Sequence, residues 1–193
     1  MGNRIGKLTL LLVLGIATLL ATAYGQEEGM KPEAYSAVAM GVGGSVGGKS
    51  IQFDFRITRY ATDDEVNKFA GLLKANGQDA LRRALEKEDV GRVNPVGSVG
   101  NQIAVARKVQ AGKDTVITIV TARIMNFGEL YRSGRSVDYP FGYLQVKLND
   151  KGVGAGKIFP AASIRFNKKH GRVEIESFGN AEYIKAVNVR PQK

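Results

Sequence analysis

The sequence predicts a β-rich α+β domain: a strongly curved antiparallel sheet or partly closed barrel with an inserted two-helix hairpin. Three observations lead to this fold class. Strand and helix patterns occupy separate blocks, with a strand pair, then helices over residues 62–88, then a longer run of strands. The turns between strands are short, which implies antiparallel neighbours. Gly152, Gly154 and Gly156 leave one face of one strand bare, which permits strong coiling or close backbone approach.

The first two predicted strands flank a glycine-rich turn. Residues 36–42 (SAVAMGV) form the first, and residues 51–58 (IQFDFRIT) alternate strictly between apolar and polar side chains. A period of two with one polar face is typical of a half-buried antiparallel strand. Residues 43–50 (GGSVGGKS) are therefore expected to be the turn of a hairpin.

This turn matches two functional motifs, and the strand after it argues against both. Residues 43–50 fit the phosphate-binding loop G-x-x-x-x-G-K-[ST], and their first five fit the serine-hydrolase elbow G-x-S-x-G. Both motifs require a helix immediately afterwards. A serine triad also needs a histidine, and the only one, His170, lies in a turn rich in positive charge. We expect no nucleotide ligand and no triad at Ser45.

Residues 62–88 change to a helical period. Thr62 and Glu65 form a capping-box pattern at the start of the first helix, and residues 66–73 carry one apolar stripe. Asn76–Gly77 predicts the end of that helix, because glycine accepts the left-handed conformation of a C-cap. A second helix over about residues 78–87 follows almost at once, so the two are expected to form a hairpin or a corner.

The period returns to two after Gly91. Residues 115–124 (TVITIVTARI) are rich in β-branched side chains and apolar on both faces, which is typical of a central strand. Turns are predicted at residues 149–152 (NDKG) and 167–171 (NKKHG). The remaining predicted strands cover residues 103–109, 143–148, 164–166, 173–176 and 183–189.

Residues 1–25 have the pattern of a secretory signal peptide: basic Arg4 and Lys7, an apolar run over residues 8–20, then small residues for cleavage. The run is shorter than the ~20 residues of a membrane span, so no span is expected after cleavage. Residues 26–193 are then a single exported domain, secreted or periplasmic. The chain has no cysteine and one histidine, which excludes thiolate and histidine-rich metal sites, and we expect no metal or cofactor.

Basic residues outnumber acidic ones, 28 to 18, and cleavage removes only Arg4 and Lys7 of them. A basic exported protein can meet anionic lipid head groups, acidic glycans or nucleic acid. The charges are scattered rather than grouped in blocks, which favours an ordinary soluble surface with a lysine excess. No nucleic-acid partner is expected.

The long connection at residues 126–140 (NFGELYRSGRSVDYP) is the main candidate site, because long loops in compact domains are often functional. Its arginines and tyrosines can grip a phosphate, carboxylate or sugar with forked donors and flat stacking faces. Alternatively, the arginines pair with the acids of the loop and only fix its shape. Glu129 and Asp138 can also act as a general acid–base pair. The candidate ligand-binding residues are Arg123, Glu129, Tyr131, Arg132, Arg135, Asp138 and Tyr139.

Residues 61–85 (ATDDEVNKFAGLLKANGQDALRRAL), 135–150 (RSVDYPFGYLQVKLND) and 161–179 (AASIRFNKKHGRVEIESFG) resemble an uncharacterised family of secreted bacterial proteins. The similarity covers most of the mature chain. It implies export and one shared domain, but it carries no known activity and transfers no site residue. The Asp-Arg-Pro pattern of that family after the central strand is replaced here by Ala122-Arg123-Ile124, so this chain lacks the aspartate.

Together these features favour an exported, non-catalytic domain that binds a small apolar or anionic ligand, or a cell-envelope partner, on a curved sheet with a helical cover. One alternative is a hydrolase or isomerase that uses Glu129, Asp138 or Tyr139. Another is an interaction role in which the basic surface docks on an anionic envelope polymer or on lipid head groups, with strong salt dependence.

Overall fold

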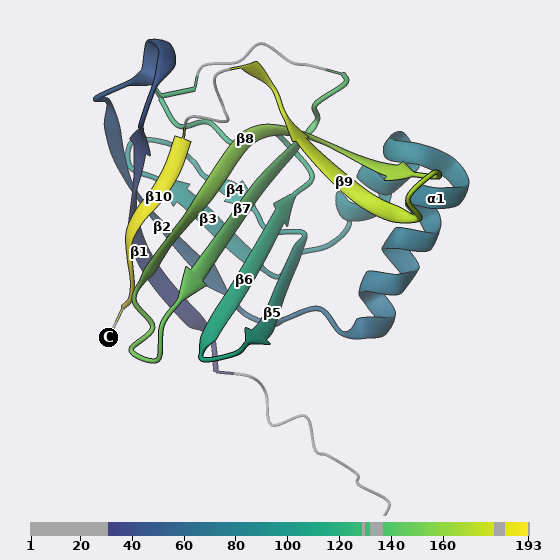
Figure 1. Cartoon of the computed structure of the whole chain (residues 1–193), viewed down its shortest axis with the longest axis horizontal. Coiled ribbons are helices and arrows are strands. Elements are labelled where there is room, and N and C mark those ends of the chain that lie inside the picture. Colours follow the sequence, from purple (N-terminus) through teal and green to yellow (C-terminus); the bar gives the residue numbers. More distant parts are fainter. Residues whose placement is uncertain (1–30, 129, 132–136, 180–183, 193) are drawn as a thin grey trace, which may run out of the picture.

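The computed structural model describes residues 31–128, 130–131, 137–179 and 184–192 (Figure 1). The predicted signal peptide falls on residues outside these ranges. In chain order the elements are β1 (Glu33–Gly41), the short 3-10 helix η1 (Gly44–Val46), β2 (Ser50–Ile57), α1 (Asp63–Leu85), β3 (Gly91–Pro95), β4 (Asn101–Gln102), β5 (Val105–Ala111), β6 (Asp114–Thr121), β7 (Phe141–Leu148), β8 (Gly154–Asn167), β9 (Arg172–Ser177) and β10 (Ile184–Pro191).

The strands of the described chain form one antiparallel sheet that curls strongly into a half-barrel (Figure 1). Its order is β4-β3-β2-β1-β10-β8-β7-β6-β5, and β9 pairs with β8 off this path. The first and last strands, β1 and β10, are hydrogen-bonded neighbours in the middle of the sheet. The predicted β-rich α+β class with a curved antiparallel sheet is confirmed.

The edge strands β4 and β5 are consecutive in the chain, and their connection crosses the opening of the half-barrel. The N–H of Ile103 donates to the carbonyl of Gly91 on β3 at 2.8 Å, whereas that of Ala104 donates to the carbonyl of Val120 on β6 at 2.9 Å. A further backbone bond joins Ala61, just after β2, to β5. Individual hydrogen bonds, and not a continuous ladder, therefore connect the two sides of the opening.

A polar cluster around Glu33 makes a second link across the opening, between β1 and β5. Its Oε2 accepts hydrogen bonds from the hydroxyls of Tyr35 (2.7 Å) and Tyr60 (2.8 Å), and its Oε1 accepts one from Lys108 Nζ (2.8 Å). Partial burial acts to raise the pKa of Glu33, but the hydrogen bonds from Lys108 and the two tyrosines outweigh it and hold the pKa below its ordinary value. The cluster therefore favours a charged carboxylate.

The concave face of the sheet is filled by the protein's own side chains. Phe53, Phe55 and Phe127 are almost completely buried there, and the Phe53 and Phe127 rings meet edge to face with centroids 5.4 Å apart. Tyr35 stacks on Phe55 at 4.9 Å. Aliphatic side chains from β5, β6, β7, β8 and β10 complete this core.

The glycines of β8 bring its backbone against β7, as their spacing predicts. A Cβ atom added to Gly154 would clash with the backbone carbonyl of Lys147, and one added to Gly156 would clash with that of Gln145. Any side chain at these two positions would force the strands apart. Gly152 belongs to the preceding turn and has a positive φ of 72°.

The predicted two-helix hairpin is not confirmed, because residues 63–85 form the single helix α1. Only Gly77 leaves helical geometry, with φ 77° and ψ −174°, so it kinks the helix where the sequence predicted a hairpin or a corner between two helices. The predicted capping box is present: Glu65 N–H donates to Thr62 Oγ1 at 3.2 Å, and Thr62 N–H donates to Glu65 Oε2 at 2.8 Å.

Helix α1 packs on the convex side of the sheet. Leu73, Leu81 and Leu85 form a second core with Phe141 and Ile164. These strand residues lie on the opposite face from those of the first core, so the curl of the sheet encloses the concave side and α1 covers only the part of the convex side near β8.

The glycine-rich turn behaves as its hairpin interpretation predicts. After η1, the backbone N–H of Gly48 donates to the carbonyl of Gly41 at 3.1 Å, and that of Gly41 donates to the carbonyl of Lys49 at 2.9 Å. Strand β2 begins at Ser50. The phosphate-binding motif is therefore followed by a strand, without the helix N-terminus that would hold a phosphate.

Candidate ligand-binding groove

A groove lies where the C-terminal half of α1 meets the β3–β4 and β6–β7 connections. Its floor includes Ala104 and Ala122, whose side chains are too small to fill the space under the helix. Two adjoining pockets make up the groove, with volumes of about 290 Å³ and about 560 Å³. Both are lined by Glu86, Ala122 and Arg123, and we call the combined feature the α1 groove.

Charged and amide side chains dominate the first pocket of the α1 groove. Two acids and two arginines face it, together with two amides. These residues are Glu86, Glu88, Arg92, Asn101, Gln102 and Arg123.

The two acids of the first pocket are paired with arginines that do not line that pocket. Arg82 Nη1 lies 2.6 Å from Glu86 Oε1, one helical turn away. Arg59 Nη2 lies 3.3 Å from Glu88 Oε2. Each acid of this pocket therefore has an arginine partner before any ligand binds, and Arg59 also pairs with Glu65.

Arg92 and Arg123, the two arginines of the first pocket, differ from these acids in their pairing. Neither side chain takes part in an ion pair with any described residue. The only hydrogen bond found for the Arg92 side chain within the described chain is a long one of 3.5 Å to the carbonyl of Val99. Both side chains are exposed. Two forked donors in the first pocket, beside acids that already have arginine partners, favour the binding of an anion there.

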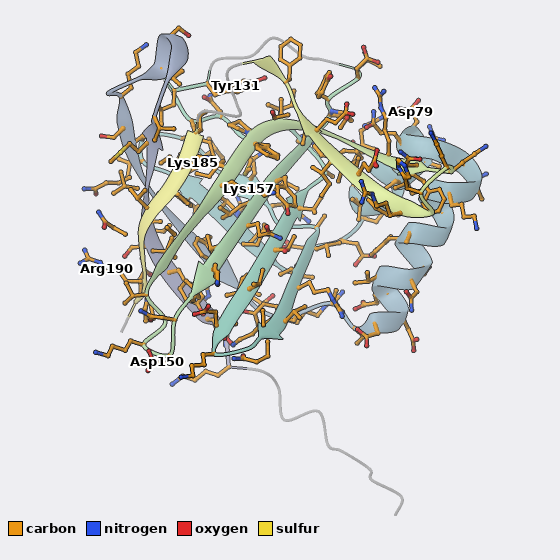
Figure 2. The ribbon with its side chains drawn as sticks, viewed as in Figure 1. Asp79, Tyr131, Asp150, Lys157, Lys185 and Arg190 are labelled. Atoms are coloured by element: carbon orange, nitrogen blue, oxygen red, sulfur yellow. The ribbon has the colours of Figure 1, made fainter. Side chains whose placement is uncertain are left out.

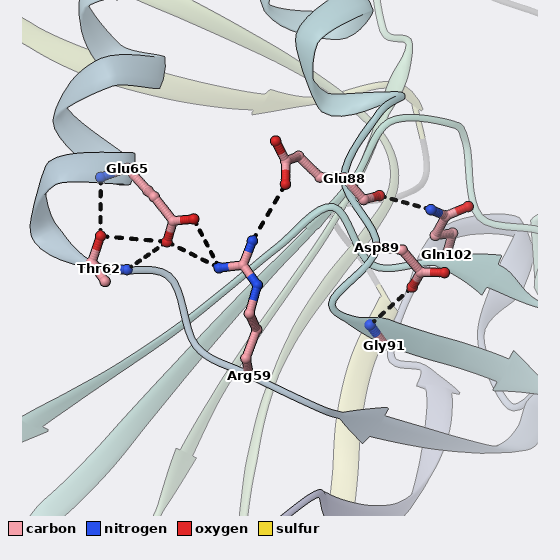
Figure 3. A network of polar contacts seen from close by, with 7 residues as sticks. All are labelled: Arg59, Thr62, Glu65, Glu88, Asp89, Gly91 and Gln102. Carbon is pink, nitrogen blue, oxygen red and sulfur yellow. Dashed lines mark hydrogen bonds and ion pairs between the residues drawn. The ribbon is translucent and has the colours of Figure 1, made fainter. Parts of the chain in front are cut away.

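A polar network holds one wall of the α1 groove in place (Figure 3). Arg59 bridges the two ends of α1: its Nη1 lies 2.8 Å from Glu65 Oε1 in the first turn, and its Nη2 reaches Glu88 after the last. Gln102 Nε2 donates to the backbone carbonyl of Glu88 at 2.7 Å, as the figure also shows. The hydrogen bond from Thr62, opposed by slight burial and helped by Arg59, lowers the pKa of Glu65.

Asn101 positions the segment that carries Arg123. Its Nδ2 donates to the backbone carbonyl of Ile124 at 3.0 Å. Thr121 Oγ1, at the end of β6, donates to the carbonyl of Arg123 itself at 2.6 Å and accepts from the N–H of Gly142 at 3.1 Å. The backbone on both sides of Arg123 is thus fixed, whereas its guanidinium extends into the groove.

The predicted site residues divide into four groups in the structure. Arg123 lies at the centre of the α1 groove. Asp138 is exposed and lies between two residues of the second pocket, Val137 and Pro140. Tyr139 packs against Phe178 with ring centroids 5.1 Å apart, and Tyr131 is buried in the concave core. Glu129, Arg132 and Arg135 lie outside the described residues.

Sequence reasoning missed Arg92, Glu86 and Asn101. Glu86 follows the last residue of α1, Arg92 lies on β3 and Asn101 on β4, so they are near one another in the chain, but only tertiary packing brings Arg123, from the segment after β6, into the same pocket. Each looks like an ordinary surface residue in its own segment.

Within the described ranges, no group of three or more histidine, cysteine or carboxylate side chains is arranged to hold a metal ion. The described part of the chain also contains no helix with the length and hydropathy of a membrane span. Comparisons with known protein families, with curated proteins and with solved structures give no significant match.

Proposed function

We propose that this protein is an exported, non-catalytic binding domain that holds an anionic ligand in the α1 groove. The observation that carries the proposal is the pairing pattern of its charges. Arg92 and Arg123 line one pocket without an ion-pair partner among the described residues, whereas the neighbouring Glu86 and Glu88 are paired elsewhere. A carboxylate or phosphate can accept two hydrogen bonds from each guanidinium.

Packing favours an anionic ligand over an apolar one. The curved sheet offers an apolar concave face, but aromatic and aliphatic side chains of the protein fill it. The first pocket of the α1 groove is instead lined mainly by charged and amide groups, which recognise oxygen-rich ligands. Export rests on the signal-peptide pattern of residues 1–25 and fits a chain without cysteine.

We do not extend the proposal to catalysis. The hydrolase or isomerase alternative needs Asp138 and Tyr139 to face one substrate. The Tyr139 ring is packed against Phe178, and the backbone carbonyl of Asp138 is held by Gln78 while its side chain is exposed. The two carboxylates beside the arginines of the first pocket are held in ion pairs, Glu86 with Arg82 and Glu88 with Arg59, which does not favour either as a catalytic base.

Isothermal titration calorimetry with citrate, glucuronate and glycerol phosphate tests the proposal. For the ligand that binds best, Arg123→Gln and Arg92→Gln are each expected to weaken binding about tenfold or more, because each removes charge-assisted hydrogen bonds. Arg83→Gln is the matched control, since Arg83 is an exposed residue of α1, the helix beside the groove, but does not line the groove. Equal losses in all three variants would show non-specific attraction by net charge, and no loss in the groove variants would refute the site.

A further inference from the structure

The convex side of the sheet carries two lysines directly opposite each other. Lys157 on β8 and Lys185 on β10 are register partners, and both are half-buried. Figure 2 labels them on these neighbouring strands. Register partners in an antiparallel pair have Cβ atoms about 4.5–5.5 Å apart and point to the same side. The two lysine side chains therefore leave the sheet from neighbouring positions on the same face, and neither lines the α1 groove.

This pair lacks the compensation that other lysines of the sheet receive. Lys108 pairs with Glu33 at 2.8 Å, and Lys147 pairs with Asp114 at 2.8 Å. Lys157 and Lys185 take part in no ion pair with the residues that the structure describes. Like charges directly opposite each other destabilise a strand pair.

The described register neighbours of the two lysines do not supply a negative charge. Along the same cross-strand row, Met40 is the register partner of Lys185, and Gln145 is that of Lys157. The amide of Gln145 is turned away, because its Nε2 donates to Thr118 Oγ1 at 3.2 Å.

Aromatic rings hold Lys157 in place. Its Nζ lies 5.6 Å from the ring centroid of Tyr143 and 5.5 Å from that of Phe159, and these two rings stack on each other at 5.6 Å. The attraction of the ammonium to the ring faces reduces the number of positions it can adopt. One of the two charges is therefore already positioned before a partner arrives.

We infer that Lys157 and Lys185 form a second binding site, which accepts a phosphate monoester group. Such a group carries a charge of about −1.5 to −2 at neutral pH and three acceptor oxygens, so one group can neutralise both ammoniums. A single carboxylate would neutralise only one. The group can belong to a soluble phosphate ester or to a lipid such as phosphatidic acid, and the site recognises the phosphate in either case.

Two probes distinguish these sources: soluble glycerol phosphate, and phosphatidylcholine vesicles with or without phosphatidic acid. Binding of the soluble ester assigns a soluble ligand, and binding only to vesicles with phosphatidic acid assigns a lipid surface. Each of Lys157→Gln and Lys185→Gln is expected to weaken vesicle binding about fivefold. Lys151→Gln, in the exposed turn before β8, removes the same charge and serves as the control.

Four results would overturn the inference: no binding of either probe, unchanged binding by the double lysine variant, an equal loss in Lys151→Gln, or loss in Arg123→Gln alone. The last result would assign the phosphate to the α1 groove. The first three leave the proposed function intact, because that depends on Arg92 and Arg123.

Thermal unfolding gives a readout that does not depend on binding. In phosphate-free buffer, Lys185→Gln is expected to raise Tm, because it removes the repulsion and leaves Lys157 over its rings. Added glycerol phosphate should then raise the Tm of the natural protein more than that of the variant. A lower Tm for Lys185→Gln without phosphate would show that the two lysines do not repel each other and would contradict the inference.

Discussion

Gln78 connects the kink of α1 to the loop before β7 by donating its Nε2 to the backbone carbonyl of Asp138 at 3.0 Å. The Oε1 of the same amide accepts a hydrogen bond from the N–H of Ile164 on β8 at 2.9 Å. One side chain thus joins the helix, a loop beside the α1 groove and the sheet. Gly77 permits this, because its non-helical backbone precedes Gln78 directly.

Replacing Gln78 tests this connection. Gln78→Ala leaves the N–H of Ile164, a buried residue, without its partner, and we expect the free energy of unfolding to fall by about 1–2 kcal/mol. Urea unfolding measures the change. The control is Asn67→Ala, which removes an amide from an exposed position of the same helix and should not lower the free energy by more than about 0.5 kcal/mol. Equal losses of stability from the two changes would contradict the claim that Gln78 joins the helix, the loop and the sheet.

The Glu33 cluster predicts a loss of stability in acid. Because the folded pKa of Glu33 is lowered, its contribution is present above the ordinary carboxylate range and is lost as pH falls through the folded pKa. Glu33→Gln should lower the free energy of unfolding by about 1 kcal/mol at pH 7 and by much less at low pH. The value at pH 7 is modest because partial exposure screens the charge. Urea unfolding at both pH values, with Asp150→Asn as an exposed control, measures this. A loss of unfolding free energy that does not change with pH would contradict a stabilising role for the charged Glu33 carboxylate.

The same cluster predicts a loss of stability in alkali. Burial and the adjacent Glu33 carboxylate both raise the pKa of Tyr35 and of Tyr60 above the ordinary value of about 10. A raised folded pKa gives stability that is complete below the unfolded value and is lost as pH rises above it. Tyrosinate absorbance should therefore show late-titrating tyrosines in the folded protein and none in denaturant. Titration of every tyrosine near pH 10 without unfolding would contradict this expectation.

Two glycine substitutions are predicted to have opposite effects on stability, one at the contact between β7 and β8 and one in α1. Gly156→Ala places a methyl group against the β7 backbone and should destabilise the protein by about 2–3 kcal/mol. Gly71→Ala, in α1 with open space around it, should stabilise it by about 0.5–1 kcal/mol. Denaturation midpoints of the two variants compare these effects. A neutral Gly156→Ala would mean that the strands are not in close contact there.

The fold could be predicted from sequence largely because the local pattern of apolar, polar and glycine residues identifies its strands. Strict alternation in residues 51–58 and the glycine spacing at Gly154 and Gly156 both express local backbone geometry, which neighbouring residues determine. The helical hairpin was predicted wrongly at Gly77. A left-handed glycine suits both a helix end and a kink, and the hydrogen bonds of Gln78 to distant residues accompany the kink.

The site was less accessible from sequence than the fold. Arg123 could be named because it follows a recognisable central strand. Arg92 could not, because nothing in its own segment indicates that Arg123, from the connection after β6, will line the same pocket. The difference between an arginine that is paired and one that is not depends on partners such as Arg59 for Glu88, which only the tertiary structure brings within reach.

The most direct test of the central claim is an NMR titration of the arginine Nε–Hε signals with the anion that binds best in calorimetry. We predict that the signals of Arg92 and Arg123 shift together and saturate with one Kd, while that of Arg83 stays in place. Equal, non-saturating shifts of all three signals, or no shift of Arg92 and Arg123, would contradict an anion site in the α1 groove.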